Sequence, residues 1–211
     1  MFDIEYKGGN GLVLTTKKLV AFIDPKLSIV GLKDLNVNDA VEIATEPRFV
    51  LEDKNALIQI EGPGEYEIGD FSIRGVSTMR HIDAPGAERL ATMYRIDVTD
   101  VRIALLGNIA PLLDEDQLEA LGVIDVLILP VGGGGYTLDA TSAAGIVRQI
   151  DPKVVIPVHY ADQGLRYEVP QDTFETFTKE LGAPVEVTSK LKIKSAQLLP
   201  QTLTVIELTR S

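Results

Sequence analysis

The stretch from Val126 to Tyr160 constrains the fold more than any other, because it contains a complete β-α-β unit. Val126–Leu129 is an unbroken aliphatic run, which is typical of a strand covered on both faces, and Pro130 follows it. A second apolar run, Val154–Val158, ends at His159. Ligands of α/β sheets usually bind beyond the carboxyl ends of the strands. The pattern therefore predicts that His159 lies at a functional edge of a sheet.

A run of glycines and a helix join these two strands. Gly132–Gly135 let the backbone adopt positive φ and approach another group closely. The run lacks the Lys and the Ser or Thr of a P-loop, so nucleotide binding by that mechanism is disfavoured. It either cradles an anion ahead of the helix or packs the loop against the sheet. Asp139 or Thr141 is the predicted N-cap of the helix, and Asp151–Pro152 is its predicted end.

The composition is that of a globular protein. A chain of 211 residues, 45% of them hydrophobic, can bury one good core, so we expect a single domain over residues 1–211. The net charge of −11 disfavours nucleic acid as a partner, because binding a phosphate backbone requires clustered Lys and Arg. The absence of cysteine excludes thiol catalysis, disulfides and cysteine-ligated zinc.

We expect no membrane association. The first residues show neither a basic region nor an apolar region of a secretory leader, and no run approaches the roughly 18 apolar residues of a membrane span. The cytoplasm is therefore the expected compartment. The sequence leaves the oligomeric state open.

Strand patterns dominate the first half of the chain, and strands alternate with helices in the second half. The first three strands are expected to form an antiparallel meander. This order predicts an α+β protein, a four-layer αββα sandwich of two facing sheets with helices outside. Helices are expected at Leu112–Leu121, after Asp139 and at Gln171–Leu181, and residues 49–55 form either a helical turn or a loop. The main expected strands are 2–6, 12–15, 19–23, 41–44, 56–60, 71–77, 92–98, 102–106, 126–129, 154–158, 185–188, 191–194 and 203–208.

Several segments resemble, in order and spacing, the metallo-β-lactamase fold superfamily, and within it the small bacterial metal-dependent hydrolases similar to ascorbate-phosphate lactonase. The resemblance covers almost the whole chain and implies the αββα sandwich. The matching strings are FIDP (22–25), GPGEYEIG (62–69), IRGVST (73–78), GAER (86–89), IALLGN (103–108), DVLILPVGGGGYTLDATSA (125–143), VVIPVHY (154–160) and SKLKIK (189–194).

The resemblance implies a cluster of metal ligands. In this family a His-x-His-x-Asp-His loop, a later His, an Asp after a Gly and a final His hold one or two divalent ions, which generate hydroxide from bound water near neutral pH. Aligning Thr45 with the family's threonine places Glu46, Arg48, Val50 and Leu51 where His, His, Asp and His belong. None of the four keeps the family's residue type.

The remaining ligand positions are partly kept. The family's third histidine falls near Arg80 or His81, where this chain carries one extra residue. The Gly-Asp step of the family reads Gly-Asn here, so Asn108 keeps the shape of the aspartate without its charge. His159 matches the final ligand, and Asp24 matches a supporting aspartate. The resemblance therefore implies one good ligand and one doubtful one.

These replacements predict that the usual dinuclear centre is absent. A zinc site needs three or four donors at about 2.0–2.2 Å, and the fixed cation of Arg48 would repel a divalent ion. Glu46 and Arg48 either form a salt bridge that fills the emptied pocket or lie in a solvated loop. His159 is either a surviving site residue or a hydrogen-bonded relic, and His81 is either a site residue or a surface-loop residue.

The residues support two hypotheses. The first is a protein that has kept the scaffold, lost the metal and cofactor, and acts as an inactive binding or scaffold protein for a small anionic ligand. The second is an active hydrolase of a small ester, lactone or phosphorylated metabolite, by fold analogy. It would use one Zn or Mn ion held by His159, His81 and a carboxylate, or His159 as a base. A purely structural subunit is a third alternative. The predicted catalytic residues are Asp24, Asn108 and His159, and the predicted pocket residues are Glu46, Arg48, His81, Gly133 and Gly134.

Overall fold

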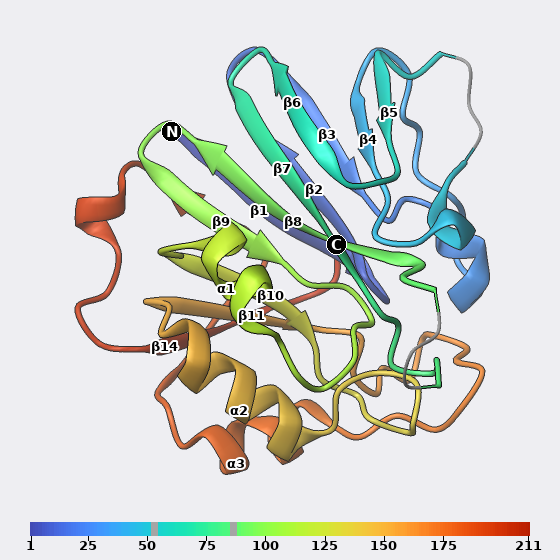
Figure 1. Cartoon of the computed structure of the whole chain (residues 1–211), viewed down its shortest axis with the longest axis vertical. Helices are drawn as coiled ribbons and strands as arrows, with labels where there is room; N and C mark the ends of the chain where they lie inside the picture. Colours follow the sequence, from blue (N-terminus) through green and yellow to red (C-terminus); the bar gives the residue numbers. More distant parts are fainter. Residues whose placement is uncertain (52–54, 85–87) are drawn as a thin grey trace.

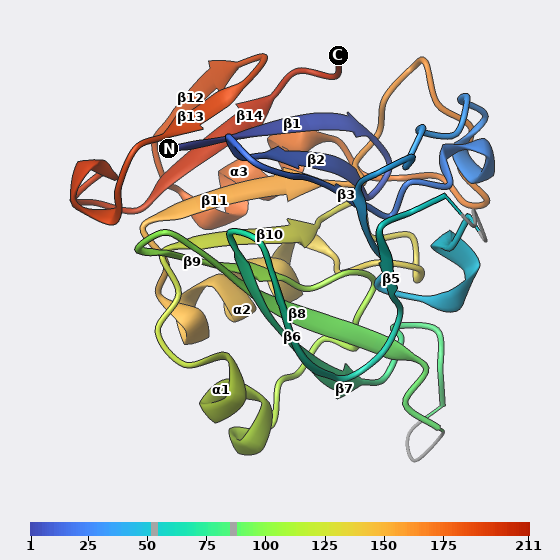
Figure 2. The same ribbon diagram turned by 90° about the horizontal axis from the view of Figure 1, so that it is seen from above.

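The computed structural model describes residues 1–51, 55–84 and 88–211 and contains two β-sheets packed face to face (Figures 1 and 2). The first sheet has the order β13-β1-β2-β3-β4-β5. The predicted antiparallel meander is confirmed for β1 to β3, whereas β4 and β5 add in parallel, after longer connections. The strands are β1 (Phe2–Gly8), β2 (Gly11–Thr15), β3 (Val20–Ile23), β4 (Val41–Ile43), β5 (Ile58–Ile60) and β13 (Leu191–Ile193).

The second sheet has the order β12-β14-β11-β10-β9-β8-β7-β6. It is antiparallel from β6 to β9 and parallel from β9 to β12. The parallel pair β10 and β11 confirms the predicted β-α-β unit. The strands are β6 (Gly64–Ile68), β7 (Phe71–Thr78), β8 (Ala91–Val98), β9 (Val101–Leu105), β10 (Val126–Pro130), β11 (Val154–Val158), β12 (Val185–Thr188) and β14 (Thr204–Leu208).

Three α-helices lie beside the second sheet (Figure 1), so the predicted αββα arrangement is confirmed. They are α1 (Glu115–Leu121), α2 (Ala140–Ile150) and α3 (Phe174–Leu181), and short 3-10 turns occur at η1 (Leu27–Val30), η2 (Pro47–Phe49) and η3 (Ala196–Leu198). No helix among the described residues is long and apolar enough to cross a membrane.

Two helices begin later than predicted. The helix expected from Leu112 starts at Glu115, because Asp114 accepts a hydrogen bond from the Gln117 N–H (2.8 Å) and caps it. The helix expected from Gln171 starts at Phe174, because the Asp172 backbone is already bonded to other segments of the chain. Asp139 caps α2, as one of the two alternatives predicted. Strand limits agree with prediction to within two residues.

Two predictions extend partly beyond the described residues. One is the helical turn or loop at residues 49–55, and the other is the family-like GAER string at 86–89. Of the first, η2 covers only Pro47–Phe49.

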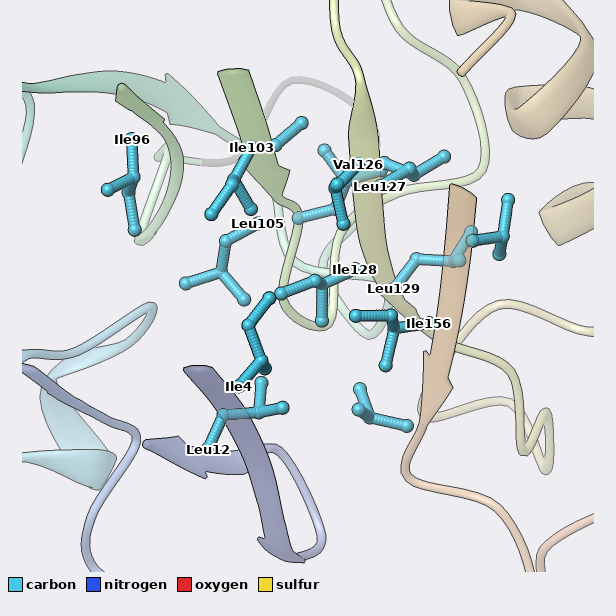
Figure 3. Close-up of a cluster of buried hydrophobic side chains, with 14 of the residues drawn as sticks. Ile4, Leu12, Ile96, Ile103, Leu105, Val126, Leu127, Ile128, Leu129 and Ile156 are labelled. Atoms are coloured by element: carbon cyan, nitrogen blue, oxygen red, sulfur yellow. The ribbon is translucent and has the colours of Figure 1, made fainter. Parts of the chain in front are cut away.

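The core lies between the sheets. Figure 3 shows Ile4 and Leu12 of the first sheet reaching toward Leu105 and Ile128 of the second. All four side chains are almost completely buried. Each side chain of this size contributes roughly 1.5–3 kcal/mol when it is buried. This apolar layer fixes the two sheets against each other and so fixes the distance between their strand ends.

Four polar residues follow strands from the two sheets. Asp24 follows β3, Thr45 lies just beyond β4, Asn108 lies just beyond β9, and His159 follows β11. The His159 N–H donates to the carbonyl oxygen of Gly9 in the β1–β2 turn (2.9 Å), which joins the sheets at this edge. The fold therefore brings together residues that are far apart in the sequence.

Candidate functional site

Two site residues have a left-handed backbone. Asp24 has φ 45° and His159 has φ 50°. Such conformations are uncommon for residues other than glycine and are often found at functional sites. Both side chains are almost completely buried at the common edge of the two sheets.

Four side chains form a buried hydrogen-bonded series, which we call the polar chain. Nδ1 of His159 donates to Oδ1 of Asn10 (2.9 Å). Nδ2 of Asn10 donates to Oδ1 of Asn108 (3.2 Å), and Nδ2 of Asn108 donates to Oε1 of Glu46 (2.9 Å). Every donor points the same way, from the imidazole toward the carboxylate. The polar chain thus satisfies its members internally, as buried polar groups require.

The histidine at the start of the polar chain is neutral. Burial, with a further contribution from the positive charge of Arg48, lowers the pKa of His159 to about 3. The rings of Tyr136 and Tyr167 lie 5.9 Å and 5.0 Å from its ring, measured between centroids. His159 is therefore an uncharged ring among aromatic neighbours.

Asp24 is held mainly by Thr45, with a smaller hydrogen-bond contribution from Asn10 of the polar chain. Its two carboxyl oxygens accept hydrogen bonds from the Thr45 N–H and from the Thr45 hydroxyl, both at 2.7 Å. Burial nevertheless raises the pKa of Asp24 to about 7, because these bonds only partly offset desolvation. Burial also raises the pKa of Glu46, against the hydrogen bond from Asn108. Both carboxyl groups therefore hold protons more tightly than exposed ones.

The two arginines near the site have separate partners. Arg48 donates to the Tyr136 hydroxyl and to Oε1 of Glu168 (2.9 Å). Arg80 pairs with Asp83 at 2.7 Å and lies 4.0 Å from Oε2 of Glu46. Of the two alternatives for Glu46 and Arg48, the salt bridge is not formed, and Glu46 is buried rather than part of a solvated loop. Glu46 points inward just before η2, whereas the Arg48 guanidinium lies over the Tyr136 ring, 5.3 Å from its centroid.

A cavity lies directly beside His159 and Asp24. Arg48, Lys26, Arg166 and Tyr167 also line it. The space open to the centre of a water molecule is about 20 Å³, enough for only one or two waters. The cavity is thus narrow in this conformation.

The predicted site residues lie in the cavity wall, in the polar chain, or outside both. Asp24, Arg48 and His159 line the cavity, and Glu46 and Asn108 lie buried in the polar chain. His81 is tied to this region by its backbone, because its N–H donates to the Asn108 carbonyl oxygen (2.9 Å). Gly133 and Gly134 belong to neither group. A side chain on either glycine would meet the 169–172 segment, with Asp172 or Pro170 atoms 2.9 Å or less away, so the glycine run packs a loop closely.

Sequence reasoning missed Asn10, the link between His159 and Asn108. Asn10 lies in the Gly-Gly-Asn-Gly turn between β1 and β2, and a turn asparagine carries no signal that distinguishes it from any other. Tyr136 and Tyr167 were also missed as neighbours of His159. Their proximity depends on how two loops fold over the strand ends.

The donor set at this edge differs from that of a zinc site. Such a site needs three or four converging donors. Among the residues that the structure describes, no group of three or more His, Cys, Asp or Glu side chains is placed to hold a metal ion. The polar chain occupies Nδ1 of His159 and one oxygen of Glu46 with amide groups. In the described part of the chain these donors are therefore bonded to one another and do not converge on one point.

Two facing sheets flanked by helices, with polar residues at their strand ends, define a protein of the metallo-β-lactamase fold. A family model described as "Beta-lactamase superfamily domain" matches residues 3–159. The chain belongs to this superfamily. The resemblance noted in the sequence is therefore confirmed at the level of the superfamily.

Several relatives are named UPF0173 metal-dependent hydrolases. One from Natranaerobius thermophilus is 28% identical over 59% of this chain and 52% of its own length. One from Archaeoglobus fulgidus is 33% identical over 44% of this chain and 40% of its own length, and one from Koribacter versatilis is 26% identical over 72% of each. The chain thus spans about half the length of the first two relatives.

Solved structures show the same fold. A Thermotoga maritima protein of the metallo-β-lactamase superfamily has a TM-score of 0.77 and 22% identity, over 99% of this chain and 100% of that one. Igni18, a metallo hydrolase from Ignicoccus hospitalis, has a TM-score of 0.62 and 18% identity, over 92% and 99%. At these identities the likeness shows the fold alone.

Proposed function

We propose that this chain binds a small organic anion without a metal ion, at the edge where the strands of the two sheets end, although several relatives are named metal-dependent hydrolases. The polar chain is the observation that carries this proposal. Its hydrogen bonds run in one direction from His159 to Glu46, so side chains at the site are bonded to one another instead of converging on an ion. Such a network is stable without a metal because no buried polar group in it is left unpaired.

The charge of the cavity supports an anionic ligand. Lys26, Arg48 and Arg166 all line it. Of these, Arg48 is paired with Glu168, while no ion pair or side-chain hydrogen bond joins Lys26 or Arg166 to any other described residue. Unpaired cations beside a partly desolvated cavity attract a negative charge more strongly than they do in bulk water.

The walls of the cavity support a ligand with an apolar body. Phe49, Tyr136 and Tyr167 contribute aromatic rings, and Leu27 and Val30 contribute aliphatic groups. Small-molecule sites typically combine such walls with a few polar groups that fix orientation. A compact organic anion with a ring or a short hydrocarbon part matches this combination.

A metal content measurement tests the metal-free proposal. Protein purified without chelators is expected to contain far less than one Zn, Mn or Fe ion per chain, because donors are bonded to one another. Mass spectrometry of the elements measures this content, and His159→Ala is expected to leave it unchanged. A near-stoichiometric ion that disappears in His159→Ala would reject the proposal.

A ligand screen tests the binding part of the proposal. Organic monoanions are expected to raise the midpoint of thermal unfolding, since a ligand at a hundred times its Kd stabilises the folded state by about 2.7 kcal/mol. Lys26→Gln is expected to weaken this effect, whereas Lys17→Gln, in the turn before β3 and away from the cavity residues, serves as the matched control. Equal stabilisation of all three proteins would contradict the assigned site.

The second candidate is an active hydrolase of a small ester, lactone or phosphorylated metabolite, and the names of the relatives favour it. The neutral imidazole of His159 could accept a proton as a base, since burial and Arg48 keep it uncharged. A single Zn or Mn ion held by His159, His81 and Asp24 or Glu46 would require these side chains to move together. Turnover that is lost in His159→Asn would favour this candidate.

A further inference from the structure

The segment between β11 and α3 separates the narrow cavity from a wider groove. Tyr167, Glu168, Val169 and Gln171 line the cavity on one side and the groove on the other. We call residues 167–171 the strap. Figure 2 shows the connection that carries it running beside the η1 turn, where the Arg166 N–H donates to the Val30 carbonyl oxygen (3.0 Å). Displacing the strap would join the two spaces.

The strap is fastened at both ends and held in between by side chains. The Arg166 N–H bonds to Val30 before it, and the Asp172 N–H bonds to the Gly132 carbonyl oxygen after it. Among the described residues, no backbone-to-backbone hydrogen bond ties 167–171 itself to the rest of the chain. A segment with few backbone bonds to its surroundings opens at low cost in free energy.

Glu168 is the charged contact between the strap and the cavity wall. Its side chain is 56% exposed, yet its Oε1 lies 2.9 Å from Nη2 of Arg48, which is only 28% exposed. The Arg48 guanidinium is itself fixed over the rings of Phe49 and Tyr136, at 5.5 Å and 5.3 Å from their centroids. A preorganised guanidinium therefore already holds a carboxylate at the cavity.

We propose that Glu168 is a built-in stand-in for the ligand, and that the ligand is an aromatic carboxylate whose anionic group replaces the Glu168 carboxylate on Arg48. This inference rests on the proposed function and names its ligand class. The exchange of one carboxylate for another on the same guanidinium changes charge pairing little. Release of the strap opens the small cavity toward the groove, and the aromatic part then packs against Tyr136, which lies outside the strap.

The stand-in has a measurable consequence, because an internal carboxylate competes with the ligand. Removing its charge with Glu168→Gln is expected to tighten binding of phenylacetate about two-fold to five-fold, the size of effect that a partly exposed ion pair allows. Arg48→Gln is expected to abolish the gain. The neutral isostere phenylacetamide is expected to show no tightening in Glu168→Gln, since it does not compete for a cation.

Titration of phenylacetate into isotopically labelled protein, followed by nuclear magnetic resonance, measures these affinities. Amide signals of Gly9 and His159 report binding at this cavity rather than elsewhere. Glu180→Gln, an exposed substitution of the same kind on α3, is the matched control and is expected to bind phenylacetate like the unaltered chain. The inference is supported if Glu168→Gln binds phenylacetate more tightly than both the unaltered chain and Glu180→Gln. It is also supported if Glu168→Gln is the one protein of the three that binds phenylacetate.

Two outcomes overturn the inference. One is phenylacetate binding at the cavity that Glu168→Gln leaves equal or weaker, in which case the anion site stands and the stand-in role fails. The other is no phenylacetate binding by either protein, which rejects the aromatic carboxylate as the ligand class. The proposed function fails separately, when no organic anion of the thermal screen binds and a metal ion is found instead.

Discussion

Gly107→Ala is expected to lower the free energy of unfolding by about 3 kcal/mol, the sum of backbone strain and overpacking. Gly107 has φ 66°, which alanine adopts only with strain. A methyl group on it would lie 2.7 Å from the Thr45 Cβ and 2.9 Å from the Thr45 hydroxyl oxygen. Thr45 holds both oxygens of Asp24, so the clash disturbs the site as well as the fold. Urea unfolding measures the loss.

Gly135→Ala is the matched control for this variant. Gly135 has a similar φ of 73°, but nothing lies within 4 Å of a methyl group placed on it. Its expected loss is about 1 kcal/mol, from backbone strain alone. Equal losses in the two variants would mean that Thr45 moves aside freely. The close approach of the two strand ends would then contribute nothing to the free energy of unfolding.

The layers of the fold could be predicted because each depends on local patterns. The aliphatic run Val126–Leu129 and the run Val154–Val158 both form buried strands, and Asp139 caps the helix between them. These signals involve neighbours in sequence, where propensity and periodicity act. The late start of α1 follows from a local cap at Asp114. The late start of α3 shows the limit of such signals, since backbone bonds of Asp172 to other segments determined where the chain became helical.

The partners within the site could not be predicted in the same way. Asp24, Glu46, Asn108 and His159 were placed near one another by their strand ends, and the structure places them so. The link through Asn10 spans 149 residues of sequence to His159, and it depends on the register of a turn against a strand. Glu46 was one alternative considered as the partner of Arg48, and the partner is Glu168, on a strap with no regular structure. Contacts made by loops leave no periodic trace in a sequence.

The pH dependence of stability is expected to show two opposing contributions from the site. Burial raises the pKa of Asp24 to about 7, so between about pH 4 and pH 7 the folded protein holds a proton that the unfolded chain has released. Asp24 therefore stabilises the fold less as pH rises. Burial lowers the pKa of His159 to about 3, so between about pH 3 and pH 6.5 the unfolded chain holds a proton that the folded protein lacks. His159 therefore makes the fold more stable as pH rises.

The two contributions cancel in the unaltered chain between about pH 4.5 and pH 6, and single variants expose each one. Over this range Asp24→Asn is expected to gain about 2 kcal/mol of stability relative to the unaltered chain as pH rises, and His159→Asn is expected to lose about 2 kcal/mol. Urea unfolding at the two ends of the range measures both differences. The double variant is expected to regain the pH dependence of the unaltered chain. If Asp24→Asn shows no such change, then Asp24 is ionised in the folded state, and its two bonds from Thr45 outweigh the cost of burying its charge.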